Sequence, residues 1–261
     1  MHAKGKKSGR RPRRFFSEEP IIDVGQVVSL SSEESGHIRD ILRLEAGASC
    51  FVTDGTGAVA EAVIAGFDRN RCALLKLQSI QRQSVSPRAS ARIHIYTAIP
   101  QKGYFDDWVR KAQELRIARL CPIETKRTVV KMKSDARRKV LGRWQRLARE
   151  AAKQSGSSTL VELLEPRSLE QAFRLAGSGE KVVFHPDRDA ESFGDWLVRK
   201  KTQGDKAPEL HLFFGPEGGF EDAEVAALRL QGAQMLSLGP TILKMDTAVS
   251  GVMGALRFLF P

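Results

Sequence analysis

Cysteine is scarce in this sequence, and histidine shows no metal-binding spacing. Cys50, Cys72 and Cys121 are odd in number, lie far apart and form no C-x-x-C pair, which argues against a disulfide framework and a zinc motif. The five histidines lack the H-E-x-x-H pattern of a catalytic zinc helix. We therefore expect three reduced thiols and no metal.

Long hydrophobic runs are also missing. No apolar stretch approaches the roughly 20 residues that span a bilayer, and no apolar segment follows the basic N-terminus as in a secretory signal. We expect a cytoplasmic protein without membrane segments. Its 261 residues, 41% of them hydrophobic, suffice for one large domain or two smaller ones with a real core.

The chain has a net charge of +11, and its positive charge is concentrated in two segments from which acidic residues are nearly absent. Residues 1–14 contribute +7 and residues 126–153 contribute +9, so the remainder carries −5. Concentrated Lys and Arg are typical of a surface that binds the phosphates of a nucleic acid. A disordered tail plus one solvated helix face is the alternative interpretation.

The first third of the chain has a pattern of short strands. We interpret residues 1–14 as a flexible basic tail and residues 15–84 as a small β-barrel domain, a type that commonly presents a basic patch to RNA. A helix over 32–42 is expected to face the core with Ile38, Ile41 and Leu42. The predicted strands are 24–30, 49–53, 59–64 and 73–77, and the predicted linker is 81–88.

From residue 91 onward, strand and helix patterns alternate, which predicts βαβ units and a parallel sheet covered on both faces. The last helix is small or apolar nearly all round, which predicts cover by a partner subunit or by the core alone. The predicted strands are 93–99, 120–123, 160–164, 181–184, 210–214 and 235–238. The predicted helices are 105–116, 137–154, 169–176, 192–200, 222–231 and 246–260.

Two glycine-proline loops follow predicted strands, one after Phe214 and one after Leu238. Glycine lets the main chain approach a ligand closely, and ligands bind at the carboxyl ends of parallel strands. The first loop, G-P-E-G-G, has neither the P-loop lysine nor the G-x-G-x-x-G pattern, and Glu217 would repel a polyphosphate. A neutral or cationic ligand fits better. S-adenosylmethionine, a sulfonium cation with an adenine edge, is suitable, although composition alone does not single it out.

The two loops resemble the C-terminal signature of the RsmE family, bacterial 16S ribosomal RNA uridine-N3 methyltransferases of the SPOUT superfamily. The matching segments are 214–220 (FGPEGGF) and 236–248 (LSLGPTILKMDTA). The resemblance extends over almost the whole chain. Further matching segments are 14–16 (RFF), 37–44 (HIRDILRL), 124–130 (ETKRTVV) and 150–155 (EAAKQS).

The resemblance implies an α/β protein with a PUA-like β-barrel domain over residues 15–84 and a SPOUT-type parallel α/β domain over residues 91–261 that contains a trefoil knot. It also implies S-adenosyl-L-methionine as cofactor, a homodimer, and N3 of a uridine in the 16S ribosomal RNA of the small ribosomal subunit as target. Two alternatives remain. One is a non-catalytic RNA-binding ribosome assembly factor, and the other is a SPOUT methyltransferase acting on ribose or another base.

Site residues follow from the same resemblance. Asp246 is the first candidate for the group that accepts or orients the N3 proton, with Glu217 second and Lys244 also a candidate; an N-cap role for Asp246 is the alternative. The predicted cofactor-binding residues are His185, Pro186, Phe214, Gly215, Pro216, Glu217, Gly218, Gly219, Leu238, Gly239, Ile242, Leu243, Lys244, Asp246, Thr247 and Ala248. The predicted RNA contacts are Arg13, Arg14, Arg39, Arg43, Lys126, Arg127, Arg149 and Lys153.

Several positions depart from the family pattern. Thr241, Lys244, Met245 and Asp246 stand where the family usually has Arg, Arg, Thr and Glu, and Arg116 replaces a common Gly. Lysine keeps the charge of arginine but loses its bidentate fork, and aspartate reaches less far than glutamate. The substitutions at Lys244, Met245 and Asp246 motivate the non-catalytic alternative.

Overall fold

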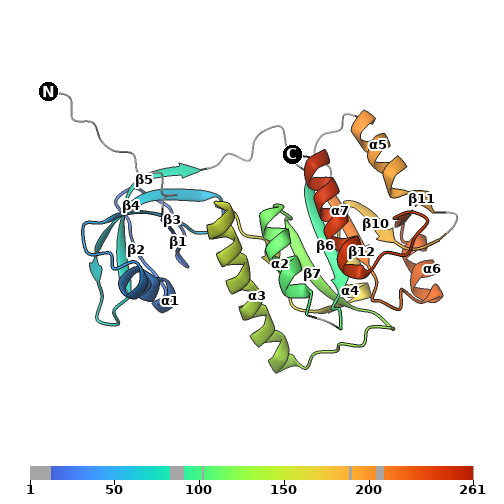
Figure 1. The fold of residues 1–261 in the computed structure, drawn as a ribbon, viewed down its shortest axis with the longest axis horizontal. Coiled ribbons are helices and arrows are strands. Elements are labelled where there is room, and N and C mark those ends of the chain that lie inside the picture. Colours follow the sequence, from blue (N-terminus) through green and yellow to red (C-terminus); the bar gives the residue numbers. More distant parts are fainter. Residues whose placement is uncertain (1–12, 83–90, 102, 188–189, 204–208, 261) are drawn as a thin grey trace. The chain divides into compact units, whose positions relative to one another are not determined.

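The computed structural model describes residues 13–82, 91–101, 103–187, 190–203 and 209–260 (Figure 1). The chain divides into two compact units, Met1–Ser84 and Val85–Pro261. Most of the predicted tail and of the predicted linker lies outside the described residues.

The first unit is a curled, mixed five-stranded sheet of order β1-β3-β4-β5-β2. β1 runs parallel to β3, and the other neighbours are antiparallel. Alternate residues of β4, from Ala58 to Ile64, are buried, because successive side chains of a strand point to opposite faces. Two register shifts between β4 and β5 add local twist. The strands are β1 (Arg14–Phe16), β2 (Val27–Ser29), β3 (Ser49–Thr53), β4 (Ala58–Phe67) and β5 (Ala73–Arg82).

The helix of this unit differs from the prediction. It consists of α1 (Ser32–Gly36) and a π-helical segment, η1 (His37–Ile41), in place of one α-helix over 32–42. The amide of Leu42 donates to the carbonyl of His37, five residues earlier, which widens the turn. Ile38 is buried, but Ile41 is 70% exposed, so the expectation that Ile41 faces the core is wrong.

The second unit contains an eight-stranded sheet whose described pairings are all parallel, which confirms the prediction. Its order is β11-β13-β10-β12-β6-β7-β8, with β9 also on β7. The short strands β9 and β11 were not predicted, since two residues give no periodic signal. The strands are β6 (Arg92–Ala98), β7 (Arg119–Glu124), β8 (Glu162–Leu163), β9 (Arg167–Ser168), β10 (Glu180–Phe184), β11 (Glu191–Ser192), β12 (Glu209–Phe214) and β13 (Gln234–Ser237).

Helices cover both faces of this sheet (Figure 1). Successive side chains of β12 point to opposite faces of the sheet and show which helices cover each face. Leu212 and Phe214 pack with α2, α3, α5 and α7, while Phe213 packs with α4 and α6. No described helix combines the length and apolar character needed to cross a membrane. The helices are α2 (Phe105–Glu114), α3 (Ser134–Ser155), α4 (Leu169–Leu175), α5 (Phe193–Gln203), α6 (Asp222–Leu230) and α7 (Met245–Leu259).

One departure from the family pattern, Arg116, lies at the end of α2. Arg116 has φ of 54°, in the left-handed region that favours glycine. The amide of Ile117 reaches back to the carbonyl of Ala112, which is the hydrogen bond of a Schellman helix end. A glycine at position 116 would adopt this conformation without strain, so Arg116 changes local strain rather than the path of the chain.

Asp106 connects α2 to α3, and its removal gives a first prediction. Its Oδ1 accepts hydrogen bonds from Trp144 Nε1 at 3.1 Å and from an Arg143 guanidinium nitrogen at 2.5 Å. Because Trp144 is buried, Asp106→Ala leaves an indole N–H without a partner and is expected to lower the free energy of unfolding by about 1–3 kcal/mol. Urea unfolding measures the change.

Asp107 supplies the matched control. It also lies in the first turn of α2 but, among the described residues, pairs only with exposed Arg110, at 2.9 Å. Asp107→Ala is therefore expected to change the unfolding free energy by less than about 0.5 kcal/mol. Equal losses in the two variants would show that the Trp144 hydrogen bond is not the source of the effect.

Candidate functional site

A cavity of about 380 Å³ opens at the carboxyl ends of β10, β12 and β13. These three strands are neighbours in the sheet, so their last residues, Phe184, Phe214 and Ser237, meet in the cavity wall. This is the edge at which open parallel sheets bind ligands. The two glycine-proline loops follow β12 and β13, as expected from the sequence.

The first loop packs tightly on itself. A Cβ on Gly215 would lie 3.1 Å from the ring of Phe220 and 3.2 Å from its amide nitrogen, closer than most real Cβ contacts. The amide of Gly219 donates to the carbonyl of Pro216 at 2.8 Å, and Gly219 has φ of 71°. The loop therefore requires glycine at both positions and exposes main-chain groups to the cavity.

The second loop is more open. Gly239 has φ of 118°, and its amide donates to the Ser237 hydroxyl at 3.3 Å. Ile242 is 90% exposed, although it also forms part of the cavity wall. The chain then enters α7 at Met245, which contacts the core.

Most predicted cofactor-binding residues line this cavity. Lys244, Asp246 and Thr247 do not, and their roles stay predictions. Predicted residues in the wall are His185, Pro186, Phe214, Gly215, Pro216, Glu217, Gly218, Gly219, Leu238, Gly239, Ile242, Leu243 and Ala248. The wall also contains Phe184, Phe220, Asp222, Ser237, Thr241 and Met245, which were not predicted as contacts although they adjoin the two loops or the strand ends in sequence.

Arg127, predicted as an RNA contact, also lines the cavity. Its guanidinium donates to the carbonyl of Gly218 at 2.9 Å and so supports the first loop. On the same loop, the Glu217 carboxylate accepts from the amide of Gln101 at 3.2 Å. The wall thus has one guanidinium, Arg127, and two carboxylates, Glu217 and Asp222. Arg127 and the Gln101 amide that holds Glu217 lie on segments that follow the central strands β7 and β6.

His185 contributes an unpaired polar atom. Its amide donates to the carbonyl of Leu236, which holds the residue at the end of β10. Its Nδ1 is buried and finds no hydrogen-bond partner among the described residues. Because a buried polar atom without a partner costs roughly 1–3 kcal/mol, a polar ligand atom at this point would restore the lost hydrogen bond.

Asp246 lies in the first turn of α7 and faces α2. Its Oδ1 is 3.0 Å from Trp108 Nε1, 3.4 Å from Lys111 Nζ and 3.4 Å from Ser250 Oγ. The residue at the N-cap of α7 is Lys244, which makes no side-chain capping bond. The alternative prediction that Asp246 caps this helix is therefore wrong, since its carboxylate connects two helices instead.

The predicted RNA contacts divide between the two units. Arg43, Lys126 and Arg127 are exposed, whereas Arg39 is held by Asp40 at 3.1 Å and by the carbonyl of Arg71 at 2.8 Å. The remaining predicted contacts are half-buried: Arg13 and Arg14 at β1, and Arg149 and Lys153 on α3.

Comparison with known proteins identifies the second unit. Residues 87–257 match the family model described as an RNA methyltransferase domain. The chain belongs to this family of RNA methyltransferases. The match covers more than half of the chain, and the resemblance to RsmE proteins is confirmed by relatives that align with nearly its full length.

Two curated relatives carry the name ribosomal RNA small subunit methyltransferase E. The Bacillus subtilis protein is 26% identical over 251 residues, covering 94% of this chain and 96% of its own length. The Synechocystis protein is 29% identical over 238 residues, covering 90% and 74%. This methyltransferase is thus similar to RsmE proteins across both of its units.

Solved structures support the fold. A methyltransferase candidate from Legionella pneumophila, in complex with the bound cofactor S-adenosylmethionine, superposes with a TM-score of 0.80 at 27% identity, covering 95% of this chain and 98% of that one. A Neisseria gonorrhoeae ribosomal RNA small subunit methyltransferase E superposes with a TM-score of 0.77 at 24% identity, covering 96% and 98%. The predicted combination of a small β-barrel domain and a parallel α/β domain is confirmed, the first as a curled, mixed half-barrel.

Proposed function

We propose that this methyltransferase transfers the methyl group of S-adenosylmethionine to N3 of a uridine in 16S ribosomal RNA. The observation that carries the proposal is the cavity at three adjacent strand ends, walled by the two loops that resemble the RsmE signature. The names of the full-length relatives support the ribosomal target. The structure of the 27% identical relative with its bound cofactor supports the ligand.

The residues of the cavity fit this cofactor. Glu217 offers a carboxylate to a sulfonium cation, and the unpaired Nδ1 of His185 offers a hydrogen bond to a polar edge. The glycine-rich loops supply main-chain groups of the kind that read an adenine edge, and apolar side chains such as Phe184 and Leu238 exclude water. When bound, the cofactor supplies an electrophilic methyl group.

The chain must also manage the proton on uridine N3. This nitrogen is a poor nucleophile until the proton leaves, and the base must come out of pairing to be reached. Glu217 lies in the cavity wall, whereas Asp246 lies outside it in contact with Lys111 and Trp108. The resemblance to the RsmE signature makes Asp246 the first candidate for the base and Glu217 the second; Lys244, which is exposed, would contact phosphate.

Mapping the modified nucleotide tests the function. Small subunits from a strain lacking this methyltransferase are incubated with the protein and S-adenosylmethionine, and the digested RNA is analysed by mass spectrometry. The expected product is N3-methyluridine at one position. A methylated ribose or another base would favour the second SPOUT alternative. Cofactor binding and RNA binding without turnover would favour an assembly factor.

Removing predicted RNA contacts is expected to make the affinity for RNA depend less steeply on salt concentration. Each Lys or Arg set against a phosphate contributes a slope of roughly 0.7–0.9 to the dependence of log affinity on log salt. The double variant Arg149→Ala with Lys153→Ala is therefore expected to reduce the slope by roughly 1–2 while leaving cofactor affinity unchanged. Filter binding of 16S RNA at several salt concentrations measures it.

Two exposed cations elsewhere in the same unit provide the matched control. Arg174 lies on α4 and Lys201 on α5, so replacing both by Ala removes the same charge from outside the predicted RNA surface. The control slope is expected to equal that of the wild type. If both double variants lose the same slope, net charge rather than a defined α3 contact governs binding.

We further propose a homodimer that uses α7. Val249, Val252 and Leu256 are buried against the chain's own core, but Phe258 is 84% exposed on the same helix. Phe258 is followed by half-buried Leu259 and Phe260, and adjoining apolar side chains of this kind, unlike a single one, are typical of a surface that a partner covers. Light scattering at micromolar protein is expected to give twice the mass of one chain, and a monomeric mass would contradict the dimer.

The trefoil knot also stays a prediction.

A further inference from the structure

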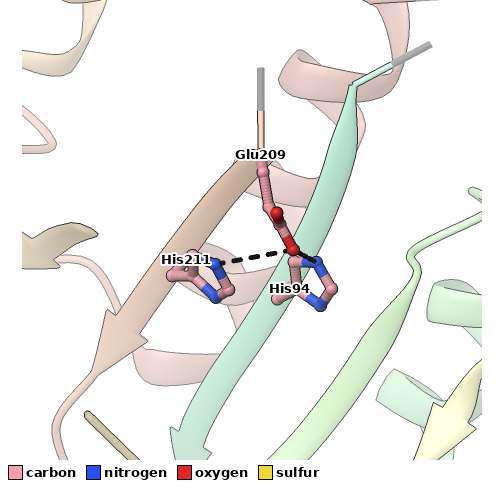
Figure 2. Close-up of side chains that lie close together, drawn as sticks. All are labelled: His94, Glu209 and His211. Atoms are coloured by element: carbon pink, nitrogen blue, oxygen red, sulfur yellow. Dashed lines mark ion pairs between the residues drawn. The ribbon is translucent and has the colours of Figure 1, made fainter. Parts of the chain in front are cut away.

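A second polar cluster lies away from the cavity, near the amino ends of the central strands (Figure 2). His94 on β6 and His211 on β12 are register partners, and Glu209 begins β12. One possible ligand atom from each of the three residues lies within 4.8 Å of the others. The cavity lies at the carboxyl ends of the sheet, so the proposed methyl transfer leaves this cluster without a role.

The distances among these atoms are close to those of a metal site. Glu209 Oε1 lies 3.1 Å from His94 Nε2 and 3.8 Å from His211 Nε2. Ligand atoms on a tetrahedral zinc ion, with bonds of about 2.0–2.1 Å, are roughly 3.3 Å apart. The two imidazole rings are stacked, with 11° between their planes, so one ring must turn about its Cβ–Cγ bond to aim its lone pair at a shared ion.

Both histidines are buried with unpaired nitrogen atoms. Each residue is 1% exposed, and neither nitrogen of His94 nor Nε2 of His211 makes a hydrogen bond among the described residues. Although His94 Nε2 is close to Glu209, the contact lacks the direction of a hydrogen bond.

Surrounding residues orient His211 for such a role. Tyr96 Oη lies 3.2 Å from Nδ1 of His211, and Arg119 in turn lies 3.5 Å from Tyr96 Oη. A ligating histidine usually bonds through its other nitrogen in this way. Gly179 packs directly against this ring and fixes its position, because a Cβ there would stand 2.5 Å from His211 Cδ2 and Nε2.

We propose that His94, Glu209 and His211 form a binding site for a divalent transition metal, with Zn²⁺ the best suited. Two neutral imidazoles and one carboxylate are a common zinc ligand set, and water completes the tetrahedron. The Glu209 side chain is 42% exposed and gives the ion a path from solvent. The site joins β6 to β12 at the centre of the sheet, so its role is structural and independent of the proposed reaction.

Calorimetric titration of the full, untagged chain with zinc chloride, after removal of metal by a chelator, tests the site. The expected result is one ion per chain, a higher melting temperature with zinc, and visible absorption typical of a tetrahedral site when cobalt is used. Glu209→Gln keeps the shape of an exposed side chain and is expected to weaken binding at least about tenfold and to abolish the shift in melting temperature. His211→Gln is expected to do the same.

Two controls separate this site from adventitious binding. Glu162→Gln removes a neighbouring carboxylate that pairs with Arg119, and His37→Gln removes an exposed histidine; both are expected to bind zinc like the wild type. Absence of binding to the wild type overturns the proposal. So does an unchanged affinity in Glu209→Gln, a readout that does not depend on whether the buried histidine variant folds.

Discussion

Replacing Asp246 by Asn is expected to lower the rate of methyl transfer about 100-fold, because an amide cannot accept the proton of uridine N3. The affinity for S-adenosylmethionine is expected to change little, since Asp246 lies outside the cavity wall. An asparagine oxygen can still accept the hydrogen bond from Trp108, so folding should be preserved. Single-turnover transfer to small subunits at saturating cofactor measures the rate, and calorimetry measures the affinity.

The variant Lys111→Met distinguishes two possible roles of Asp246, as the acceptor of the uridine proton or as a structural link between α7 and α2. Lys111 pairs with Asp246 at 3.4 Å, and both side chains are more than a third exposed, so the ion pair adds less than about 1 kcal/mol to stability. If Asp246 is the base, this variant loses far less activity than Asp246→Asn. Equal losses in rate and in melting temperature would show that Asp246 only joins α7 to α2. If Glu217→Gln loses more methyl-transfer activity than Asp246→Asn, then Glu217 in the cavity wall is the base.

Replacing Gly239 by Val is expected to weaken S-adenosylmethionine binding about 100-fold. Its φ of 118° is strained for any other residue, at a cost of roughly 1–3 kcal/mol. No described atom lies within 4 Å of the position that a Cβ would take, so backbone strain rather than a clash displaces the loop. A displacement of about 1 Å in a binding site can cost about 100-fold. Calorimetry with S-adenosylmethionine measures the change.

Gly142→Ala is the control, because Gly142 shares the open surroundings of Gly239 but not its strained backbone conformation. Gly142 lies within α3, where a Cβ also meets nothing within 4 Å among the described residues, and its φ is ordinary. This variant is expected to bind the cofactor normally and to gain up to about 1 kcal/mol of helix stability. Normal cofactor binding by Gly239→Val would exclude the second loop from the site.

Much of the second unit could be predicted because its signals are local. Short strands that are mostly apolar, such as β12, and helices with a periodic apolar stripe, such as α3, carry their pattern in consecutive residues. The two loops were predictable for the same reason, since glycine and proline mark turns directly after a strand. The first unit was less regular. A hydrogen bond to the fifth preceding residue leaves no distinct sequence pattern, so the exposure of Ile41 was not foreseen.

The sequence by itself determined the alternation of the main strands and helices in the second unit, the parallel sheet, the positions of both glycine-proline loops and the similarity to RsmE methyltransferases. Only the tertiary structure showed that Asp246 turns toward α2 and that Arg127 supports the first loop. It alone brought His94 and His211 together, 117 residues apart in the chain. The physical reason is that strand register and helix packing set which distant side chains meet, and neither leaves a periodic signal along the chain.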